Sequence, residues 1–358
     1  MGKARFFVLL ALVLCGFPPV APGAEPTVPF PCPDRQKLDI SRIFDAVEAL
    51  DGVVKVSDLV LAPSFSKTGE VYLKLETQQF IGAFKLRGAY YMMSKLTDQQ
   101  KARGVVTCSA GNHAQGVGFA ADRFGVKATI FLPASAPETK IKAVRAYKNV
   151  EVKLVNGSFD DARGAAEDFQ LRTDAVYIPP FDDYNIIAGQ GTVGWEIMNQ
   201  LPSVDIIVVP IGGGGLISGI SFVAKTLKPS CRIYGVQPEG AAAMLQSRQA
   251  GTVVSLDKVS TIADGTAVKQ PGKITYSLCQ QYVDGIVTVS EAQIEDAIRR
   301  LYRDCHVTAE GAGALSVAAV LSGKIPAAGK KVVCVVSGGN IDPDKLNRIL
   351  NAEPAPAR

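Results

Sequence analysis

The chain has 358 residues, of which 47% are hydrophobic and 20% charged, enough apolar content for the cores of about two domains. Its 38 basic and 34 acidic residues leave a formal net charge of +4, with the two signs mixed along the chain. Because no basic run and no interleaving of aromatic and basic residues occurs, nucleic acid is not expected as a partner.

The N-terminus is predicted to be a secretory leader. Lys3 and Arg5 precede an apolar stretch over residues 6–17, which is shorter than the ~20 residues of a membrane-spanning helix and typical of a signal peptide. We therefore expect a signal peptide over residues 1–24, a disordered linker over 25–35, and export to the periplasm or the medium without membrane association once the leader is removed. A mis-assigned start would instead leave a cytoplasmic protein.

Lys85 stands in the segment GAFKLRGAYY, residues 82–91, at an unfavourable place for a charge. Leu86, Tyr90 and Met93 follow at helical spacing, so Lys85 is predicted at a helix N-terminus, where the macrodipole disfavours an ammonium group. The side chain either extends to water or is used as an uncharged amine, as in a Schiff base.

Short apolar strands alternate with helices, which predicts an α/β protein with mostly parallel sheets covered by helices. Helical segments include residues 112–125 and 137–147. The predicted strands lie at residues 104–109, 128–133, 151–156, 175–180, 204–210, 232–238, 285–290 and 330–337.

The cysteines give no sign of a metal site. None of the seven has C-x-x-C spacing and only two histidines are present, so no zinc site is expected. Cys108 and Cys334 lie in apolar strands and are predicted to be buried thiols. Removal of the leader would leave six cysteines, an even number that permits disulfides without implying them.

Residues 109–113, with the sequence SAGNH, join a predicted strand to a predicted helix. Small residues and the Asn112 side chain at a helix N-terminus suit an anion such as a carboxylate. Ser109 and Asn112 are also common helix caps, so this motif alone leaves both interpretations open.

Four consecutive glycines, Gly212 to Gly215, lie between a buried strand and an amphipathic helix. Bare backbone N–H groups at a helix N-terminus form an anion site suited to a phosphate. The loop lacks the Lys-Ser/Thr pair of a nucleotide P-loop, and Ile217 and Ser218 stand where the third glycine of a dinucleotide loop would fall. A single phosphate on a small cofactor is therefore favoured over a tight turn alone.

A third strand ends in Ser337, Gly338, Gly339 and Asn340. Functional groups gather at the carboxyl ends of parallel strands, so this junction and the two others could line one cleft. Taken alone it would be interpreted as a glycine turn. Together with Lys85, the three junctions describe a site for pyridoxal phosphate and an amino acid.

In combination, the segments FKLRGA, SAGNHAQG, GGGGL, AEGAGAL and SGGNID resemble those of the fold-type II pyridoxal-phosphate enzymes, specifically the short threonine/serine dehydratase and serine racemase group. The resemblance extends from about Ile43 to Leu350. It implies a homo-oligomeric enzyme that acts on a small amino-acid substrate with pyridoxal 5'-phosphate as its cofactor.

The resemblance also implies two domains of the tryptophan synthase beta type, each with a mostly parallel twisted sheet flanked by helices. A large cofactor-binding domain would comprise residues 36–103 and 183–350, and a small domain residues 104–182. The tail over residues 351–358 is expected to be disordered.

Individual roles follow from the same resemblance. Lys85 would carry the cofactor as a Schiff base, Asn112 would bond its 3-hydroxyl, and Ser337 would face its pyridine nitrogen. The remaining cofactor contacts would come from Phe84, Gly212, Gly213, Gly214, Gly215, Leu216 and Gly265. The substrate carboxylate would lie against Ser109, Ala110, Gly111, Asn112 and His113.

The reaction implied is α,β-elimination of hydroxy-amino acids, which converts L-threonine to 2-oxobutanoate and L-serine to pyruvate, each with ammonia. In it Lys85 takes the Cα proton while the cofactor ring withdraws electrons. The preferred substrate among threonine, serine and hydroxyaspartate is left open.

Several positions depart from the family pattern. Ala110 stands where racemases of the group carry a serine as acid/base on the second face of the substrate, which favours elimination. Gln237 and Ala243 replace a glutamate and an aspartate of the metal-binding racemases, so no divalent-cation site is expected there. Ile81 and Ala83 replace a usual Thr and Ser before the lysine and leave the substrate fit open.

Alternative functions remain within and beyond this group. A serine racemase or a threo-3-hydroxyaspartate dehydratase would use the same site. A cysteine-synthase type of β-replacement would share the fold and cofactor. An exported binding protein without catalysis is the fourth alternative, against which the intact Lys85 argues.

Overall fold

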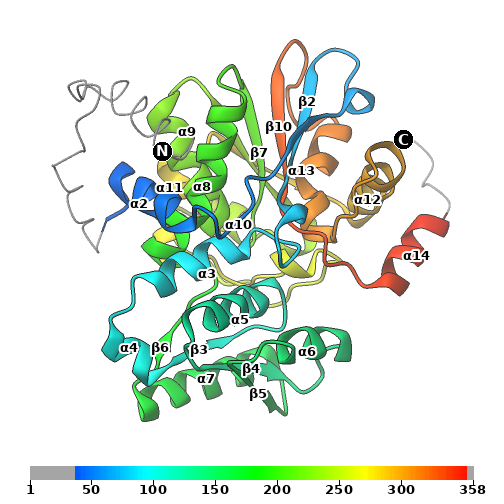
Figure 1. The fold of residues 1–358 in the computed structure, drawn as a ribbon. Helices are drawn as coiled ribbons and strands as arrows, with labels where there is room; N and C mark the ends of the chain where they lie inside the picture. Colours follow the sequence, from blue (N-terminus) through cyan, green and yellow to red (C-terminus); the bar gives the residue numbers. More distant parts are fainter. Residues whose placement is uncertain (1–36, 353–358) are drawn as a thin grey trace, which may run out of the picture.

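The computed structural model describes residues 37–352, which form two sheets packed between helices (Figure 1). The predicted leader over residues 1–24, the linker over 25–35 and most of the tail lie outside the described residues. Within the described range, no helix combines the length and the apolar character needed to cross a bilayer.

The larger sheet has six strands in the order β1-β2-β10-β7-β8-β9. Only β1 runs antiparallel to its neighbour. The central strands β7 and β10 are almost wholly buried, as expected for strands with helices on both faces. The strand bounds are β1 Leu59–Leu61, β2 Glu70–Leu75, β7 Ile206–Pro210, β8 Arg232–Pro238, β9 Gly285–Val289 and β10 Lys331–Val336.

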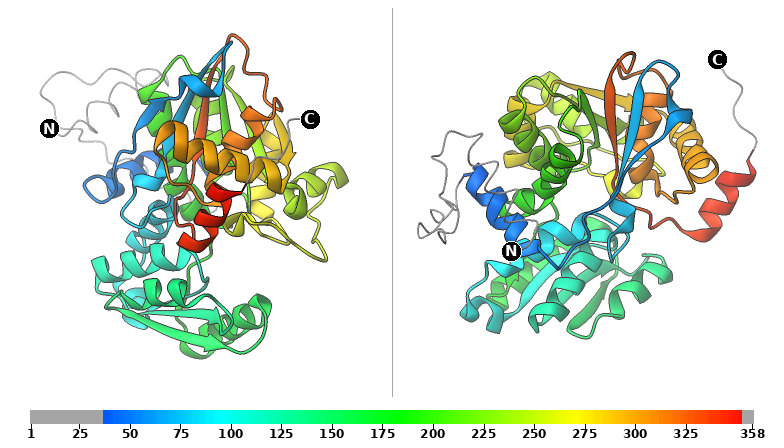
Figure 2. Two further views of the ribbon diagram at one scale, coloured as in Figure 1. Left: turned by 90° about the vertical axis from the view of Figure 1, so that its right-hand side faces the viewer. Right: turned by 45° about the horizontal axis from the view of Figure 1, so that its top comes forward.

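The smaller sheet has four parallel strands in the order β5-β4-β3-β6. Both views of Figure 2 show it with its own helices beside the larger sheet and not continuous with it. Its strands are β3 Val105–Cys108, β4 Ala128–Pro133, β5 Val150–Val155 and β6 Val176–Tyr177, and its helices are α5 Asn112–Phe124, α6 Glu138–Arg145 and α7 Phe159–Thr173.

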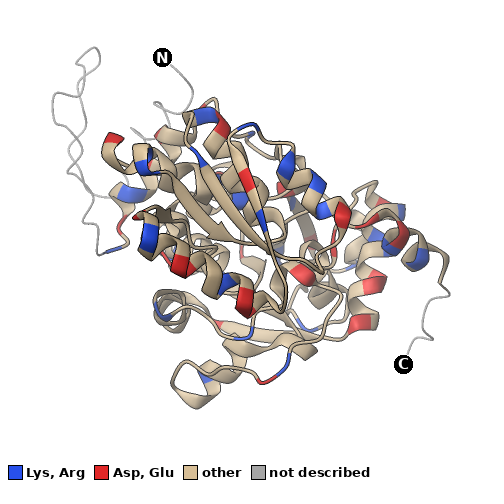
Figure 3. Ribbon diagram, turned by 90° about the horizontal axis from the view of Figure 1, so that it is seen from below, with Lys and Arg blue, Asp and Glu red and all other residues tan. Residues whose placement is uncertain are grey.

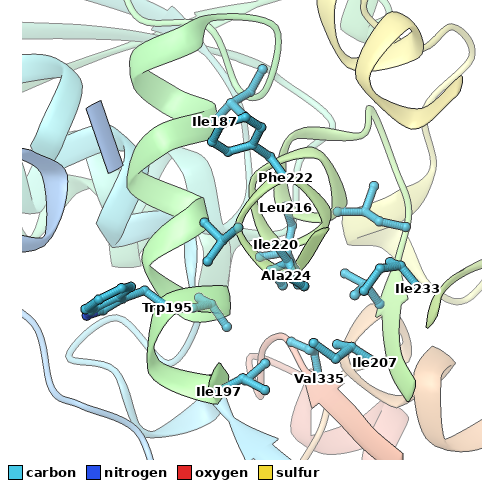
Figure 4. Close-up of a cluster of buried hydrophobic side chains, with 14 of the residues drawn as sticks. Ile187, Trp195, Ile197, Ile207, Leu216, Ile220, Phe222, Ala224, Ile233 and Val335 are labelled. Atoms are coloured by element: carbon cyan, nitrogen blue, oxygen red, sulfur yellow. The ribbon is translucent and has the colours of Figure 1, made fainter. Parts of the chain in front are cut away.

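Two hydrophobic cores cover the two faces of the larger sheet. Helices α8 (Tyr184–Gln200) and α9 (Gly215–Leu227) pack on one face, in a single core that includes Ile187, Ile220 and Val335 (Figure 4). Helices α12 (Glu291–Cys305) and α13 (Gly311–Leu321) pack on the other face. The remaining helices are α2 Ile40–Leu50, α3 Lys85–Ser94, α4 Asp98–Arg103, α10 Ala243–Ala250, α11 Lys273–Tyr282 and α14 Pro343–Asn351.

The predicted α/β class with mostly parallel sheets is confirmed, and every strand named from the sequence is present. The structure adds β1 and β2, which precede the first predicted strand. In β2 the charged residue Lys74 is fully buried and stands between Leu73 and Leu75 in the sequence, so it interrupts the apolar run by which a buried strand is recognised.

Helix α3 lies between the two sheets. Met92 and Met93 pack in the core of the smaller sheet, whereas Tyr91 packs in a core of the larger one. The helix approaches α8 closely at Gly88, where a Cβ would lie 2.3 Å from Gln190 Nε2. Because α3 joins both cores, the domain limits named from the sequence stay a prediction.

The charged residues and the cysteines of the described part of the chain are distributed as the sequence predicts, with the two signs of charge mixed and two thiols buried. Basic and acidic residues are interspersed along the helices (Figure 3). Five free cysteines are present in this part of the chain, and Cys108 and Cys334 are buried as predicted.

Candidate active site

The loop before Lys85 is bound to the end of β10 by main-chain contacts. Phe84 N donates to Ser337 O at 3.1 Å and Gly339 N donates to Gly82 O at 2.9 Å. Ala83 and Gly338 form an isolated β-bridge between these two hydrogen bonds. The lysine motif and the SGGNID junction, far apart in sequence, are therefore one structural unit.

Lys85 is the first residue of α3, as predicted. Its Nζ donates to Pro180 O at 2.5 Å and lies 5.3 Å from the centre of the Phe84 ring. Burial lowers the pKa of Lys85 to about 8, because the protein does not solvate the ammonium as water does. A larger share of neutral amine near neutral pH than an ordinary lysine has suits a nucleophile or a base.

The four glycines form the turn between β7 and α9, and Gly214 has a φ of 101°. In the described part of the chain, no acceptor is found for the N–H groups of Gly213, Gly214 and Gly215, although all three residues are buried. Buried N–H groups without protein acceptors at a helix N-terminus favour an anion. Leu216 has its side chain in the core, so it would contribute through its backbone N–H.

The other side of the glycine loop is closed by side chains. A Cβ on Gly213 would lie 2.3 Å from the Phe181 ring, and a Cβ on Gly214 would lie 2.7 Å from Thr275 Cβ. Thr275 Oγ1 donates to Gly213 O at 2.6 Å, which satisfies that carbonyl within the protein. The loop therefore has no room for side chains at these two positions.

Lys85 and the glycine loop are joined through residues 180 and 181. Lys85 contacts Pro180, and the next residue, Phe181, packs against Gly213 and Gly215. Gly265 adjoins the same loop, since a Cβ on Gly212 would lie 3.2 Å from Gly265 O. These predicted cofactor residues thus form one continuous set.

Asn112 begins α5, and its side chain contacts Glu310, which the sequence analysis did not select, and Asn340, which it named only as part of the third junction. Asn112 Nδ2 donates to Glu310 Oε1 at 2.7 Å, and Asn112 Oδ1 accepts a hydrogen bond of 2.8 Å from Asn340 Nδ2. Both residues fall within segments that carry the family resemblance, AEGAGAL and SGGNID. That membership is the signal by which they could have been chosen.

Within residues 109–113 the side chains differ in direction. Ser109 Oγ accepts a hydrogen bond of 3.2 Å from Gly111 N. His113 is buried with Nε2 at 2.9 Å from Ile178 O, and burial lowers its pKa to about 3. The imidazole is therefore neutral and bound to the end of β6, so only the backbone of His113 is suited to a carboxylate. Ala110 offers a methyl group and no proton donor.

Ser337 follows β10 and is buried, with its Oγ donating to Ala312 O at 3.4 Å. This long bond leaves the hydroxyl able to turn toward another partner. Among residues 37–352 no cluster of three or more His, Cys, Asp or Glu side chains is arranged to hold a metal ion.

Comparison with known proteins identifies relatives over most of the chain. Residues 50–338 match the family described as "Pyridoxal-phosphate dependent enzyme". An L-threonine ammonia-lyase of Thermotoga maritima is 46% identical over 316 residues, which is 88% of this chain and 78% of that protein. The catabolic L-threonine dehydratase of Escherichia coli K12 is 41% identical over 314 residues, covering 87% of this chain and 95% of that protein.

Two solved structures are also similar to this chain over most of its length. Threonine deaminase isoform 2 of Solanum lycopersicum, in its processed form, superposes with a TM-score of 0.83 at 38% identity, covering 93% of each chain. Maize serine racemase has the same TM-score of 0.83 at 36% identity, covering 87% of this chain and 96% of that one.

Proposed function

Because the chain belongs to the family of pyridoxal-phosphate-dependent enzymes, we propose that it is a lyase that deaminates small hydroxy-amino acids. L-Threonine would give 2-oxobutanoate and ammonia, and L-serine would give pyruvate and ammonia. The water lost from Cβ is regained when the carbon–nitrogen bond is hydrolysed, so each net reaction is a loss of ammonia. The names of the two relatives above support threonine as a substrate.

The residues of the site fit pyridoxal phosphate. The N–H groups of Gly213 to Gly215 suit its phosphate, and Lys85 offers the amine that its aldehyde requires. Phe84, Asn112, Gly265 and Ser337 would hold the ring, and residues 109–113 would hold the substrate carboxylate. When bound, the cofactor supplies an electron sink for the Cα–H bond of the substrate.

The observation that carries the proposed reaction is the amine of Lys85, which is buried without a carboxylate. Its lowered pKa, about 8, leaves part of the amine neutral near neutral pH, so Nζ can take a proton from Cα of the substrate. Pro180 O accepts a hydrogen bond from this Nζ and orients it.

Serine racemisation is the second candidate, supported by the similarity to maize serine racemase. It requires a proton donor on the substrate face opposite Lys85. Ala110 has no ionisable group, which favours elimination over inversion.

The test is an assay of L-serine in which 2-oxo acid and D-serine are measured together by coupled absorbance and chiral chromatography. We expect 2-oxo acid to form far faster than D-serine. The variant Ala110→Ser should raise the share of D-serine. D-Serine appearing as fast as pyruvate in the parent protein would make the racemase the better assignment.

We further propose that the protein acts as a homo-oligomer. Val56, Val60, Leu61 and Phe80 are apolar and exposed by 69%, 44%, 46% and 56%, which is unfavourable for a monomer in water. Light scattering coupled to size-exclusion chromatography tests this proposal, and a monomer mass at micromolar concentration would contradict it.

Export is proposed on the leader sequence alone, with cytoplasmic retention as the alternative. Mass spectrometry of the protein from its native host would find a mature N-terminus near residue 25 if the leader is cleaved. A chain beginning at Met1 in the cytoplasm would contradict export.

A further inference from the structure

Three polar side chains form a relay across the candidate site. Asn340 Nδ2 donates to Ile81 O at 2.7 Å and to Asn112 Oδ1 at 2.8 Å. Asn112 Nδ2 in turn donates to Glu310 Oε1 at 2.7 Å. The relay joins the lysine loop, the first residue of α5 and the residue that precedes α13.

The direction of the relay is set by a group that can only accept. Ile81 O is a backbone carbonyl, so the atom of Asn340 that faces it must be the amide nitrogen. The same nitrogen faces Asn112, which places the amide oxygen of Asn112 on that side. The nitrogen of Asn112 must then face Glu310, whose ionised carboxylate can only accept.

Glu310 is enclosed by the residues that line the site. Its backbone N donates to Gly338 O at 3.1 Å. A Cβ on Gly338 would lie 2.7 Å from Glu310 Oε1, and one on Gly265 would lie 3.4 Å from the same atom. The carboxyl group thus lies next to Gly338 and Gly265 and accepts the hydrogen bond from Asn112.

We propose that Glu310 is a positioning residue of the cofactor site, which holds the Asn112 amide so that its nitrogen presents a hydrogen to an oxygen of the bound cofactor. The nitrogen carries two hydrogens, and the bond to Glu310 uses one of them. Glu310 acts through Asn112 and takes no part in proton transfer. The proposal rests on the cofactor site of the proposed function and is independent of the reaction catalysed there.

The strength of this hold should depend on pH. Burial raises the pKa of Glu310 to about 7, although the hydrogen bond from Asn112 opposes the rise. Three other charged groups act on it: Lys140 of α6 and Lys345 of α14 favour the ionised form, and Asp264 disfavours it. Above about pH 7 the carboxylate accepts a charge-assisted hydrogen bond, which is about twice as strong as a neutral one.

The test compares Glu310→Gln with the parent protein by titrating cofactor-free protein with pyridoxal 5'-phosphate. Glutamine keeps an oxygen acceptor for Asn112 Nδ2 but does not ionise. We expect the ratio of the two dissociation constants to be near one at about pH 6 and to rise to about fivefold at about pH 8, the effect of one charge-assisted bond. Because no substrate is present, this result does not depend on whether the enzyme eliminates or racemises.

A double-mutant cycle shows whether Glu310 acts through Asn112. In an Asn112→Ala background, Glu310→Gln should leave the dissociation constant and the visible absorbance band of the bound cofactor unchanged at every pH. Glu310→Leu, which removes the acceptor, should weaken binding about tenfold in the parent background. The matched control is Glu48→Gln, since Glu48 is an exposed residue of α2.

Two outcomes would overturn the proposal. One is a parent-to-variant ratio that stays at one from about pH 6 to about pH 8. The other is an effect of Glu310→Gln that persists in full without the Asn112 side chain. Circular dichroism of each variant distinguishes a change at the site from loss of the fold.

Discussion

Two cations on helix α3, only two residues apart, have opposite surroundings: Arg87 is fully buried and Lys85 is half-buried. The Arg87 guanidinium contacts two buried carboxylates, with Nε at 2.8 Å from Glu76 Oε2 and Nη1 at 2.6 Å from Glu196 Oε1. Lys85 forms no ion pair among the described residues: its Nζ donates to Pro180 O and lies near the Phe84 ring. Burial opposes ionisation of both, but Glu76 and Glu196 outweigh it and raise the pKa of Arg87, whereas burial alone lowers that of Lys85 to about 8.

This difference in partners distinguishes Arg87, whose charge has a structural role, from Lys85, whose amine is the reactive group of the proposed function. Arg87 joins α3 to α8 through Glu196 and to the end of β2 through Glu76, the first residue of the short helix Glu76–Gln78. Lys74 of β2 completes the network, with Nζ at 2.5 Å from Glu196 Oε2. The paired cation fixes the helix whose first residue is Lys85, the cation without an ionic partner.

The largest effect is expected from removing the unpaired amine. Lys85→Ala should abolish 2-oxo acid formation and the visible absorbance band, because the variant has no amine for the cofactor aldehyde and no base for Cα. Absorbance spectra and a steady-state assay measure both losses. Lys142→Ala, at an exposed position of α6, is the control. Turnover within a few-fold of the parent would refute the role of Lys85.

Removing the paired cation, Arg87, should mainly lower the stability of the fold. Arg87→Met would leave Glu76 and Glu196 buried with Lys74 as their only cation, and loss of one partner of such a network costs about 3–5 kcal/mol. Lys85→Met should cost much less, since it removes a buried charge without a partner. Urea unfolding of the cofactor-free proteins compares the two variants. Similar losses from both would refute the contrast.

The parts of this fold that follow local patterns could be predicted from the sequence. Buried parallel strands are short apolar runs, so the sequence predicts β7 and β10, which the structure confirms. The glycines between β7 and α9 predict an anion loop, and that role stays a prediction. β2 was not predicted because Lys74 serves the ion network, and a charged residue in a strand gives no apolar signal.

Contacts between distant residues account for what was missed in the site. Glu310 lies 198 residues from Asn112, and Glu196 lies 109 residues from Arg87. A single sequence carries no periodicity over such separations. The sequence indicates Lys85 because its unusual placement, a lysine at a helix start, is a local feature. Glu310 and Glu196 come into contact with Asn112 and Arg87 only through the fold.

A negative charge in the glycine loop, where only backbone N–H groups would face the cofactor phosphate, should weaken cofactor binding. Gly214→Asp adds a carboxylate to the proposed phosphate loop, next to Thr275 Cβ at 2.7 Å from the added Cβ. We expect the dissociation constant for pyridoxal phosphate to rise at least about a hundredfold, about 2.7 kcal/mol.

The matched control for this loop variant is Gly251→Asp. Gly251 also has a positive φ, 71°, and a Cβ there meets nothing within 4 Å. Both variants place a side chain at a positive φ, and only Gly214→Asp also introduces a charge and a close contact with Thr275 at the loop. Equal affinities in the two variants would remove the phosphate role.

The lowered pKa of Lys85 predicts a smaller, pH-dependent effect on stability. Between about 8, its value in the folded protein, and 10.5, the reference value, the unfolded chain binds a proton that the folded protein has lost. The stability of the cofactor-free parent should therefore rise with pH across this window relative to Lys85→Met. Urea unfolding at about pH 7.5 and about pH 9.5 measures the difference, and a constant difference would contradict the unpaired state of the amine.

The smallest effect is expected from removing metal ions. At Gln237 and Ala243 the chain has neither an acidic nor a basic side chain. Gln237 is buried, and its Nε2 donates to Ile211 O at 3.4 Å and to Ala241 O at 3.3 Å. Its Oε1 accepts from Leu245 N at 2.9 Å. The neutral Gln237 amide thus donates hydrogen bonds to both carbonyl oxygens that could otherwise bind a cation. Ala243 adds no carboxylate.

Activity should therefore survive exhaustive chelation with EDTA. The variant Gln237→Glu sharpens the test, because a carboxylate cannot donate to Ile211 O or Ala241 O, and it would leave two carbonyls and an anion facing one another. We expect that variant to lose about 1–3 kcal/mol of stability and to recover part of it with magnesium or calcium, since oxygen ligands of this kind suit both ions. Loss of parent activity in EDTA, restored by either ion, would show that another set of ligands binds a required metal.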